Sequence, residues 1–205
     1  MAPAKTLRPV AGVRPEYLKA FAEIVARVAA KLAKSPAQSL PVRMYVAGGA
    51  ALYLITGVRV SEDIDATFSR RLVLGEDIEV SYRDTDDSAR LLYLDRNYND
   101  TLGLLHQDAY ADSHPVRIPG IDAARVEVRI LSPLDLAVTK ISRFSEQDRA
   151  DIQLLAREGL IEAKSLRRRS EEALQDYVGA LDSVRTSIAL ACRIVEAAAQ
   201  PRRKR

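Results

Sequence analysis

The hydrophobic pattern of the chain changes twice along its length. Between residues 14 and 35, apolar side chains recur every three or four positions after Pro15, which predicts an amphipathic helix. Short apolar or alternating runs follow, namely PVRMYVAG, DIDATF, DIEVSYR, ARLLYLD, HPVRIP and ARVEVRIL, separated by polar loops. These runs predict the strands of a small mixed sheet. The segment GAALYLIT, which Gly57 follows directly, predicts a helix between the first two strands.

After Ser132 and Pro133 the pattern becomes helical again. Four segments have helical periodicity: PLDLAVTKISRF, SEQDRADIQLLAREG, AKSLRRRSEEALQDYVGA and LDSVRTSIALACRIVEAAA. Ser132 before a proline is typical of a helix start, and Gly159 is typical of a helix end. We therefore expect an α+β protein with an N-terminal helix in residues 1–35, a core in 36–131 whose helices lie on one face of the sheet, and a helical subdomain in 132–205.

Composition and charge narrow the functional classes. The 205 residues, 47% of them apolar, suit an ordinary globular protein; the N-terminus lacks the apolar stretch of a secretory signal, so we expect a cytoplasmic protein with no membrane segment. Cys192 lies in an apolar run and is expected to be a buried thiol, and two histidines give little support for a zinc site. The net charge of +3 gathers in SLRRRS (165–170) and QPRRKR (200–205), which are either phosphate-binding segments or solvated surface.

Two short segments carry the candidate chemistry. On one strand, Asp63 and Asp65 point to the same side of the sheet, and two neighbouring carboxylates are compensated well by a divalent cation such as Mg²⁺. Upstream, Gly48 and Gly49 let backbone N–H groups approach a phosphate at a helix N-terminus. The order of these segments leaves room for one helix and a return turn between them, which predicts a site for phosphate plus metal.

The segment GGAALYLITGVRVSEDIDATFS resembles the nucleotidyltransferase superfamily typified by DNA polymerase beta, and most closely its AbiEii-type branch, which includes toxins of toxin–antitoxin systems. The matching positions in this segment are Gly48, Gly49, Gly57, Arg59, Ser61 in place of a threonine, Asp63 and Asp65. Further along, LSPLDLAVTKISRFSEQDRADI is similar to a second segment of that branch, at Lys140, Arg143, Asp148 and Asp151. The resemblance covers residues 44–155 and departs from the family pattern at Gln147, where a lysine is usual.

The resemblance implies transfer of a nucleoside monophosphate from an NTP to an acceptor hydroxyl, with two Mg²⁺ ions held by Asp63, Asp65 and a third carboxylate. Glu127 on the strand ARVEVRIL is the first candidate for the third position, and Asp108 and Asp112 are alternatives. The resemblance further implies that Gly48 and Gly49 cradle the triphosphate. Residues for further phosphate contacts are Arg59, Ser61 and Lys140, with Asp148 as an additional catalytic position.

Simpler interpretations of these residues stay open at the sequence level. Glu127 is also explained as a strand residue that pairs with a neighbouring arginine, and Lys140 as a solvated lysine. Asp148 and Asp151 lie three positions apart, where ion pairs with Arg143 or Arg149 are an ordinary helix-surface feature. The sequence alone therefore does not separate a catalytic set from a set of structural ion pairs.

Three functions fit the sequence. The first is an AbiEii-like nucleotidyltransferase that modifies RNA, tRNA in particular, as the toxin partner of an antitoxin protein. The second is a small-molecule nucleotidyltransferase of the aminoglycoside-modifying kind, which requires an acidic pocket for a cationic substrate. The third is a non-catalytic module with this fold that binds nucleic acid or a protein.

Overall fold

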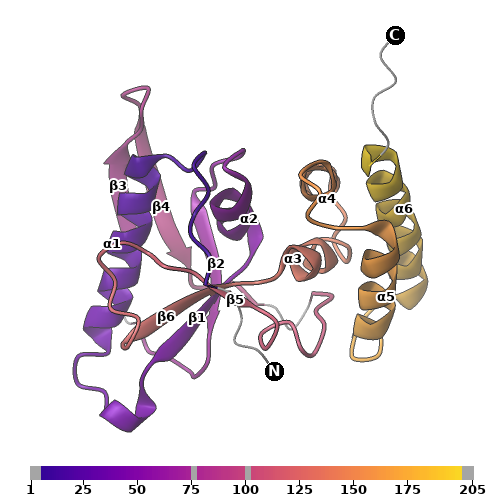
Figure 1. Ribbon diagram of the computed structural model, residues 1–205. Helices are drawn as coiled ribbons and strands as arrows, with labels where there is room; N and C mark the ends of the chain where they lie inside the picture. Colours follow the sequence, from indigo (N-terminus) through magenta and orange to yellow (C-terminus); the bar gives the residue numbers. More distant parts are fainter. Residues whose placement is uncertain (1–5, 75–77, 100–102, 200–205) are drawn as a thin grey trace. The chain divides into compact units, whose positions relative to one another are not determined.

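A computed structural model describes residues 6–74, 78–99 and 103–199 of the chain. The chain divides into two compact units. The first comprises Met1–Tyr98 and Asp112–Leu131, and the second comprises Asn99–Ala111 and Ser132–Arg205. The chain therefore leaves the first unit, enters the second briefly, returns, and enters the second again for residues 132–205 (Figure 1).

A six-stranded mixed sheet forms the centre of the first unit, with the strand order β3-β4-β2-β1-β6-β5. Strand β1 pairs antiparallel with β2 and parallel with β6, while β2 pairs parallel with β4. The two outer pairs, β3 with β4 and β5 with β6, are antiparallel. The strands are β1 Val42–Val46, β2 Asp63–Phe68, β3 Glu79–Arg83, β4 Ala89–Asp95, β5 His114–Pro115 and β6 Val126–Ile130.

The two faces of this sheet differ in burial because side chains alternate along each strand. The even-numbered positions of the central strands are apolar and buried, for example Met44, Ile64, Leu92 and Val128. Helix α1 (Pro15–Lys31) packs against β3, β4 and β6, and α2 (Gly48–Thr56) packs against β2. The odd-numbered positions of β1, β2 and β6 carry polar and charged side chains, and those of β4 combine Ala89 and Leu91 with Tyr93 and Asp95. The helices thus bury one face and leave the other face mainly to polar residues.

Local signals account for the ends of both helices in the first unit. Helix α1 begins at Pro15, whose ring fixes a helical φ and whose missing N–H costs nothing in the first turn. Its buried stripe comprises Tyr17, Ala20, Phe21, Ile24, Val25 and Val28. Helix α2 ends at Gly57, which has the left-handed φ of +68° that favours glycine.

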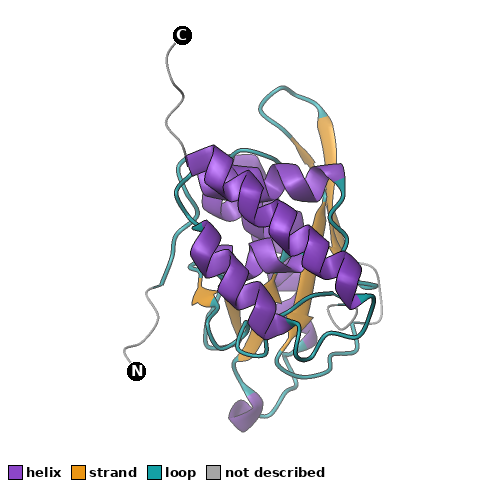
Figure 2. Cartoon of the chain, turned by 90° about the vertical axis from the view of Figure 1, so that its right-hand side faces the viewer, coloured by secondary structure: helices purple, strands orange, loops and turns teal. Residues whose placement is uncertain are grey.

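All regular elements in the described part of the second unit are helices (Figure 2). They are α3 Pro133–Thr139, α4 Glu146–Arg157, α5 Ala163–Ala173 and α6 Leu181–Ala199. Ser132 caps α3 by accepting a hydrogen bond from the Asp135 N–H, and Ser145 forms a reciprocal capping box with Asp148 at the start of α4. Helix α6 packs on both α4 and α5.

The predicted fold class is confirmed: a mixed sheet with helices on one face, followed by a helical region. One segment differs from the predicted layout, because 99–111 clusters with the C-terminal helices and not with the sheet. The Cys192 thiol is fully buried on α6, and burial raises its pKa. Of the helices that the structure describes, none has the length and apolarity needed to cross a membrane.

Candidate functional site

The glycine pair of the sequence forms the first two residues of α2, directly after β1. Gly48 has φ +58°, and a Cβ placed on it would lie 1.8 Å from Asp65 Oδ2. The Asp65 carboxylate therefore lies against the bare backbone at the start of α2. Only glycine combines this backbone conformation with so close a carboxylate. The Ala47 N–H also donates to the Asp65 carbonyl oxygen at 2.8 Å, which fixes β2 against the β1–α2 junction.

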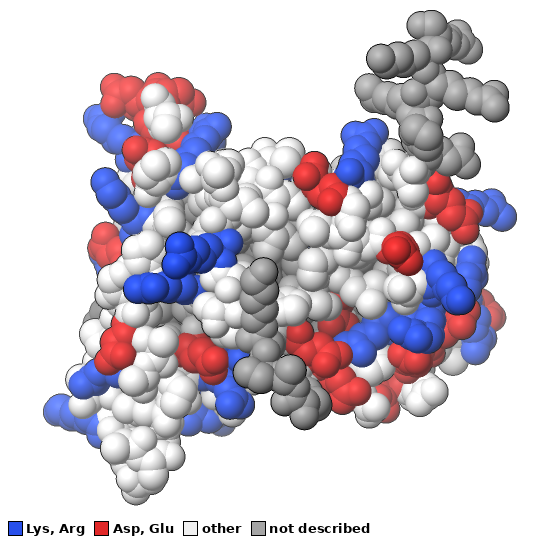
Figure 3. Space-filling model, in the orientation of Figure 1, with Lys and Arg blue, Asp and Glu red and all other residues white. Residues whose placement is uncertain are grey.

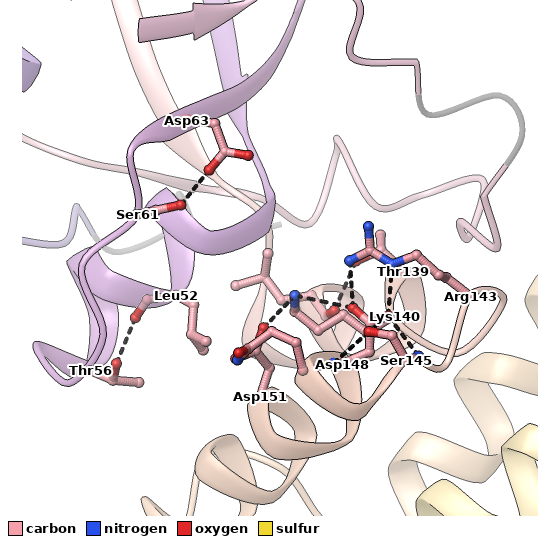
Figure 4. Close-up of polar contacts among 12 residues, drawn as sticks. Leu52, Thr56, Ser61, Asp63, Thr139, Lys140, Arg143, Ser145, Asp148 and Asp151 are labelled. Atoms are coloured by element: carbon pink, nitrogen blue, oxygen red, sulfur yellow. Dashed lines mark hydrogen bonds and ion pairs between the residues drawn. The ribbon is translucent and has the colours of Figure 1, made fainter. Parts of the chain in front are cut away.

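Gly49 borders a second polar contact of the same junction. A Cβ on Gly49 would lie 2.4 Å from Ser61 Oγ and 3.5 Å from Arg59 Nη2. The Ser61 hydroxyl in turn donates to Asp63 Oδ1 at 2.5 Å, as Figure 4 shows. The structure thus brings Gly48, Gly49, Arg59, Ser61, Asp63 and Asp65 together, all within the first unit. This grouping is the one that the sequence motif predicts.

A third carboxylate on this face is Asp95, which the sequence analysis did not single out. Parallel pairing of β2 with β4 places Asp95 opposite Asp65, and Tyr93 opposite Asp63. The pKa of Tyr93 is raised, first by desolvation and then by the charges of Asp63, Asp95 and Asp65. These three aspartates, together with Glu62, therefore act on one exposed tyrosine. Asp95 Oδ1 accepts a hydrogen bond from the Asn97 N–H at 2.8 Å, which orients it at the strand end.

Glu127 lies on the same face of the sheet but at a different level. It pairs in register with Arg43 of β1, whereas the β1–β2 pairing carries Asp65 level with Ala47. Four residues along a strand correspond to about 13 Å, so Glu127 does not reach the aspartates. Its carboxylate binds Arg43 Nε at 3.1 Å and Arg129 Nη1 at 3.0 Å. These ion pairs favour the structural interpretation of Glu127.

The carboxylates of the first unit suit Mg²⁺ chemically. Within residues 6–74, 78–99 and 103–199, no three His, Cys, Asp or Glu side chains are arranged as a ready metal cluster. However, Mg²⁺ in nucleotide sites is bound by one or two protein carboxylates, with water and phosphate oxygens as the remaining ligands. Asp63 and Asp65 supply two carboxylates, and Asp95 is the nearest register position for a third. The donor set therefore fits Mg²⁺ bound together with a triphosphate.

The second unit contains the other predicted residues in a buried ionic cluster (Figure 4). Lys140 Nζ lies 2.6 Å from Asp151 Oδ2 and 3.8 Å from Asp148 Oδ1. The exposed fraction of the Lys140 side chain is only 7%, and that of Asp151 is 2%. Arg143 donates to both Asp148 oxygens at 2.8 Å, and Ser145 donates to Oδ2. Lys140 is therefore a buried, paired lysine and not the solvated lysine of the simpler interpretation.

This cluster holds Asp148 in its ionised form. Burial alone would raise the pKa of the Asp148 carboxyl, but hydrogen bonds from Arg143 and Ser145 outweigh burial and lower the pKa below its ordinary value. The same carboxylate completes the capping box at the start of α4. Asp148 therefore both caps α4 and takes part in the ionic contact with Lys140.

The remaining candidates are two aspartates and two basic segments. Asp108 belongs to the second unit and Asp112 to the first, and both are exposed. Of the basic segment 165–170, Arg169 binds Asp135 through two hydrogen bonds of 2.8 and 3.0 Å, while Arg167 and Arg168 are exposed. The tail 200–205 lies outside the described residues. On the face in Figure 3, the described basic and acidic side chains are interspersed and do not form one continuous basic surface.

The fold and the paired glycine and aspartate motifs define a nucleotidyltransferase-like protein. The chain matches the family described as "nucleotidyltransferase of unknown function (DUF6036)" over residues 23–189, and it therefore belongs to that family. The match covers residues of both units. It supports membership of the nucleotidyltransferase superfamily, but it does not support assignment to the AbiEii-type branch. No curated protein and no solved structure matches the chain.

Proposed function

We propose that the protein transfers a nucleoside monophosphate from an NTP to an acceptor hydroxyl with the help of Mg²⁺. The observation that carries this proposal is the grouping of Asp63, Asp65 and Asp95 on one sheet face, beside the glycine-formed start of α2. Negative phosphate is stabilised by a helix N-terminus, and the acids supply ligands for the cations that accompany a triphosphate. Membership of a nucleotidyltransferase family supports the same chemistry.

In this proposal each side chain has a specific task. The N–H groups at Gly48 and Gly49 bind the triphosphate at the start of α2. The missing Cβ atoms leave room for Asp65 Oδ2 and Ser61 Oγ against the same backbone. Arg59, beside Gly49, neutralises phosphate charge, and Ser61 orients the Asp63 carboxylate through its hydrogen bond. Mg²⁺ would supply positive charge that offsets the negative charge developing during phosphoryl transfer. Asp63, Asp65 and Asp95 are the residues that would hold it.

The acceptor that we propose is RNA, tRNA in particular, and the biological role that of a toxin with an antitoxin partner. Support comes from the resemblance of the two motif segments to AbiEii-type toxins and from the exposed Arg167 and Arg168 on α5. Glu127 is less suited to hold Mg²⁺ than Asp95, because two arginines already neutralise it. Lys140 and Asp148 keep their paired geometry in this proposal and maintain the structure of the second unit.

Incubation with each labelled NTP, Mg²⁺ and total cellular RNA tests the proposal. We expect label on RNA with the parent and none with Asp63→Asn combined with Asp65→Asn. Glu127→Gln is the matched control, because it removes a carboxylate from the same face at a position away from the aspartates, and it should keep the activity. Label on an aminoglycoside but not on RNA would instead favour the small-molecule class. Mg²⁺-dependent NTP binding without transfer would favour the non-catalytic module.

A further inference from the structure

A groove of about 340 Å³ lies in the second unit between α4 and α6, and its lining includes none of the charged side chains of the ionic cluster around Lys140. Its walls are formed by the residue before the α4 cap, by the exposed side of α4 and by the outer side of α6. The lining residues are Phe144, Arg149, Gln153, Leu190, Arg193, Ile194 and Ala197. We call this surface the α4–α6 groove.

Phe144 at the mouth of the groove has an unusual backbone. Its φ is +48°, a left-handed conformation that costs energy for a bulky residue. It precedes the N-cap Ser145, where an apolar side chain ordinarily packs against the fifth residue after it. Here that fifth residue is Arg149, whose guanidinium lies 5.7 Å from the Phe144 ring centroid. The ring and the cation therefore form a fixed rim on one side of the groove.

The floor of the groove is aliphatic and reaches solvent. Helix α6 buries Ile188, Ala191, Cys192 and Val195 against its own unit. On a different stripe, Leu190 is 42% exposed, and Ile194 follows it one helical turn later. A second apolar stripe on an otherwise satisfied helix is the pattern of a helix that also packs against a partner.

The charges that line the groove have one sign. Arg149 and Arg193 are its ionisable lining residues, and neither an aspartate nor a glutamate is among them. An aliphatic floor flanked by two cations is complementary to an apolar stripe flanked by carboxylates. Single-stranded RNA is disfavoured, because the floor is aliphatic and the one aromatic ring in the lining already has a guanidinium against it.

We propose that the α4–α6 groove binds an acidic amphipathic helix of a partner protein. The apolar stripe of that helix packs on Leu190 and Ile194, and its carboxylates meet Arg149 and Arg193. The inference concerns binding alone and does not depend on transferase activity. Leu190 and Arg193 are the residues that decide affinity and charge selectivity, because both are exposed before binding and buried after it.

A fluorescent synthetic peptide tests this inference on the full chain. The probe is a helical peptide of about 18 residues with leucines at i, i+3, i+4 and i+7 and glutamates between them. We expect saturable anisotropy with the parent and an increase in Kd of about tenfold for Leu190→Asp or Arg193→Glu. A peptide with lysines in place of the glutamates should not bind, because Arg149 and Arg193 repel it.

Matched controls lie on the same helix outside the groove. Leu181→Asp changes a leucine of similar exposure (38%), and Arg185→Glu reverses a cation of the same type; both should leave Kd unchanged. Circular dichroism melts verify that all four variants fold. The inference is wrong if the acidic peptide shows no saturable binding, if the groove variants and the controls bind alike, or if the lysine peptide binds equally well. Labelled single-stranded RNA that loses binding in the groove variants alone would replace the partner helix with nucleic acid.

Discussion

The two units treat their carboxylates differently. In the second unit, each buried aspartate meets a cation: Asp135 binds Arg169, Asp148 binds Arg143, and Asp151 binds Lys140. In the first unit, the half-buried aspartates share one sheet face, and the contacts of Asp63 and Asp95 are a hydroxyl and a backbone N–H. The first unit does pair its fully buried acid, since Asp84 contacts Arg14 and Arg90.

This difference gives a physical basis for separating structural acids from the acids that we propose to bind a ligand. The charge of a buried carboxylate is compensated when a cationic side chain of the protein pairs with it. Removal of that partner leaves an unpaired charge in a poorly solvated environment. Carboxylates that lie close to one another repel, and a bound cation reduces this repulsion. We therefore expect the paired acids of the second unit to contribute to stability, and we propose Asp63, Asp65 and Asp95 as ligand-binding residues. Three of the four predictions below test this assignment, and one compares glycine packing in the two units; they are ordered from the largest expected effect to the smallest.

Asp151→Asn should destabilise the protein by about 3–5 kcal/mol, because buried Lys140 then keeps only the more distant Asp148 at 3.8 Å. Urea denaturation measures the loss. The matched control is Asp182→Asn, which removes the charge of a fully exposed partner of Arg185. This substitution should leave the free energy of unfolding without a measurable change. Equal effects of the two substitutions would contradict the structural role of the buried cluster.

Two glycines extend the contrast between the units. Gly57→Ala in the first unit should cost about 2–4 kcal/mol, because the new Cβ would lie 2.7 Å from the Gly12 Cα in addition to the strain of a left-handed φ. Gly159 in the second unit also has a positive φ, but no atom lies within 4 Å of a Cβ placed on it. Gly159→Ala should therefore reduce the free energy of unfolding by only about 1 kcal/mol. Thermal melts of both variants distinguish packing from backbone strain. If the two costs are the same, Gly57 is not packed against Gly12.

Stability should depend on the ionisation of Asp148. The folded pKa of this carboxyl is lowered below its unfolded value of about 3.9, so its contribution is complete above that pH and is lost as the pH falls through the folded pKa. Asp148→Asn should therefore reduce stability at neutral pH and flatten the decline of the parent in acid. Denaturation curves from neutral pH down to the lowest pH at which the parent is still folded measure this slope. A variant with the slope of the parent would show that other carboxylates carry the acid sensitivity.

Asp63→Asn combined with Asp65→Asn should have the smallest effect on folding. Removal of two like charges relieves repulsion, so the free energy of unfolding without metal should stay the same or rise by up to about 1 kcal/mol. The parent should gain thermal stability from Mg²⁺ with NTP, and the double variant should not. Unfolding of the double variant would instead place the aspartates among the structural acids of the comparison.

Local pattern was sufficient for the fold because each element here is strongly marked. Pro15 and the buried stripe behind it, Ser132 before a proline, and the alternation in DIDATF and VEVRI each correspond to an observed helix or strand. The glycine and aspartate motif was also visible, because the chain places its two halves on consecutive elements. Because the glycines and the aspartates are close in sequence, their grouping can be predicted without a structure.

The third carboxylate could not be read from the sequence. Glu127 and Asp95 both sit at alternating positions of apolar strands, and the sequence does not state which strand lies beside β2 or in which register. Only strand pairing decides that Asp95 is opposite Asp65, while Glu127 is opposite Arg43. Likewise, the sequence predicts that Lys140 lies in a helical segment, but it does not predict that the side chain is buried. Its burial against Asp151 depends on how α3 and α4 pack.

The sequence by itself determined the elements, the fold class and the Gly48–Asp65 motif, because these depend on periodicity and on neighbours within about twenty residues. Tertiary structure alone decided which charges are compensated, because an ion pair depends on a distance of a few ångströms between side chains far apart in the chain. It also decided that a second apolar stripe of α6, at Leu190 and Ile194, remains open to solvent beside two arginines.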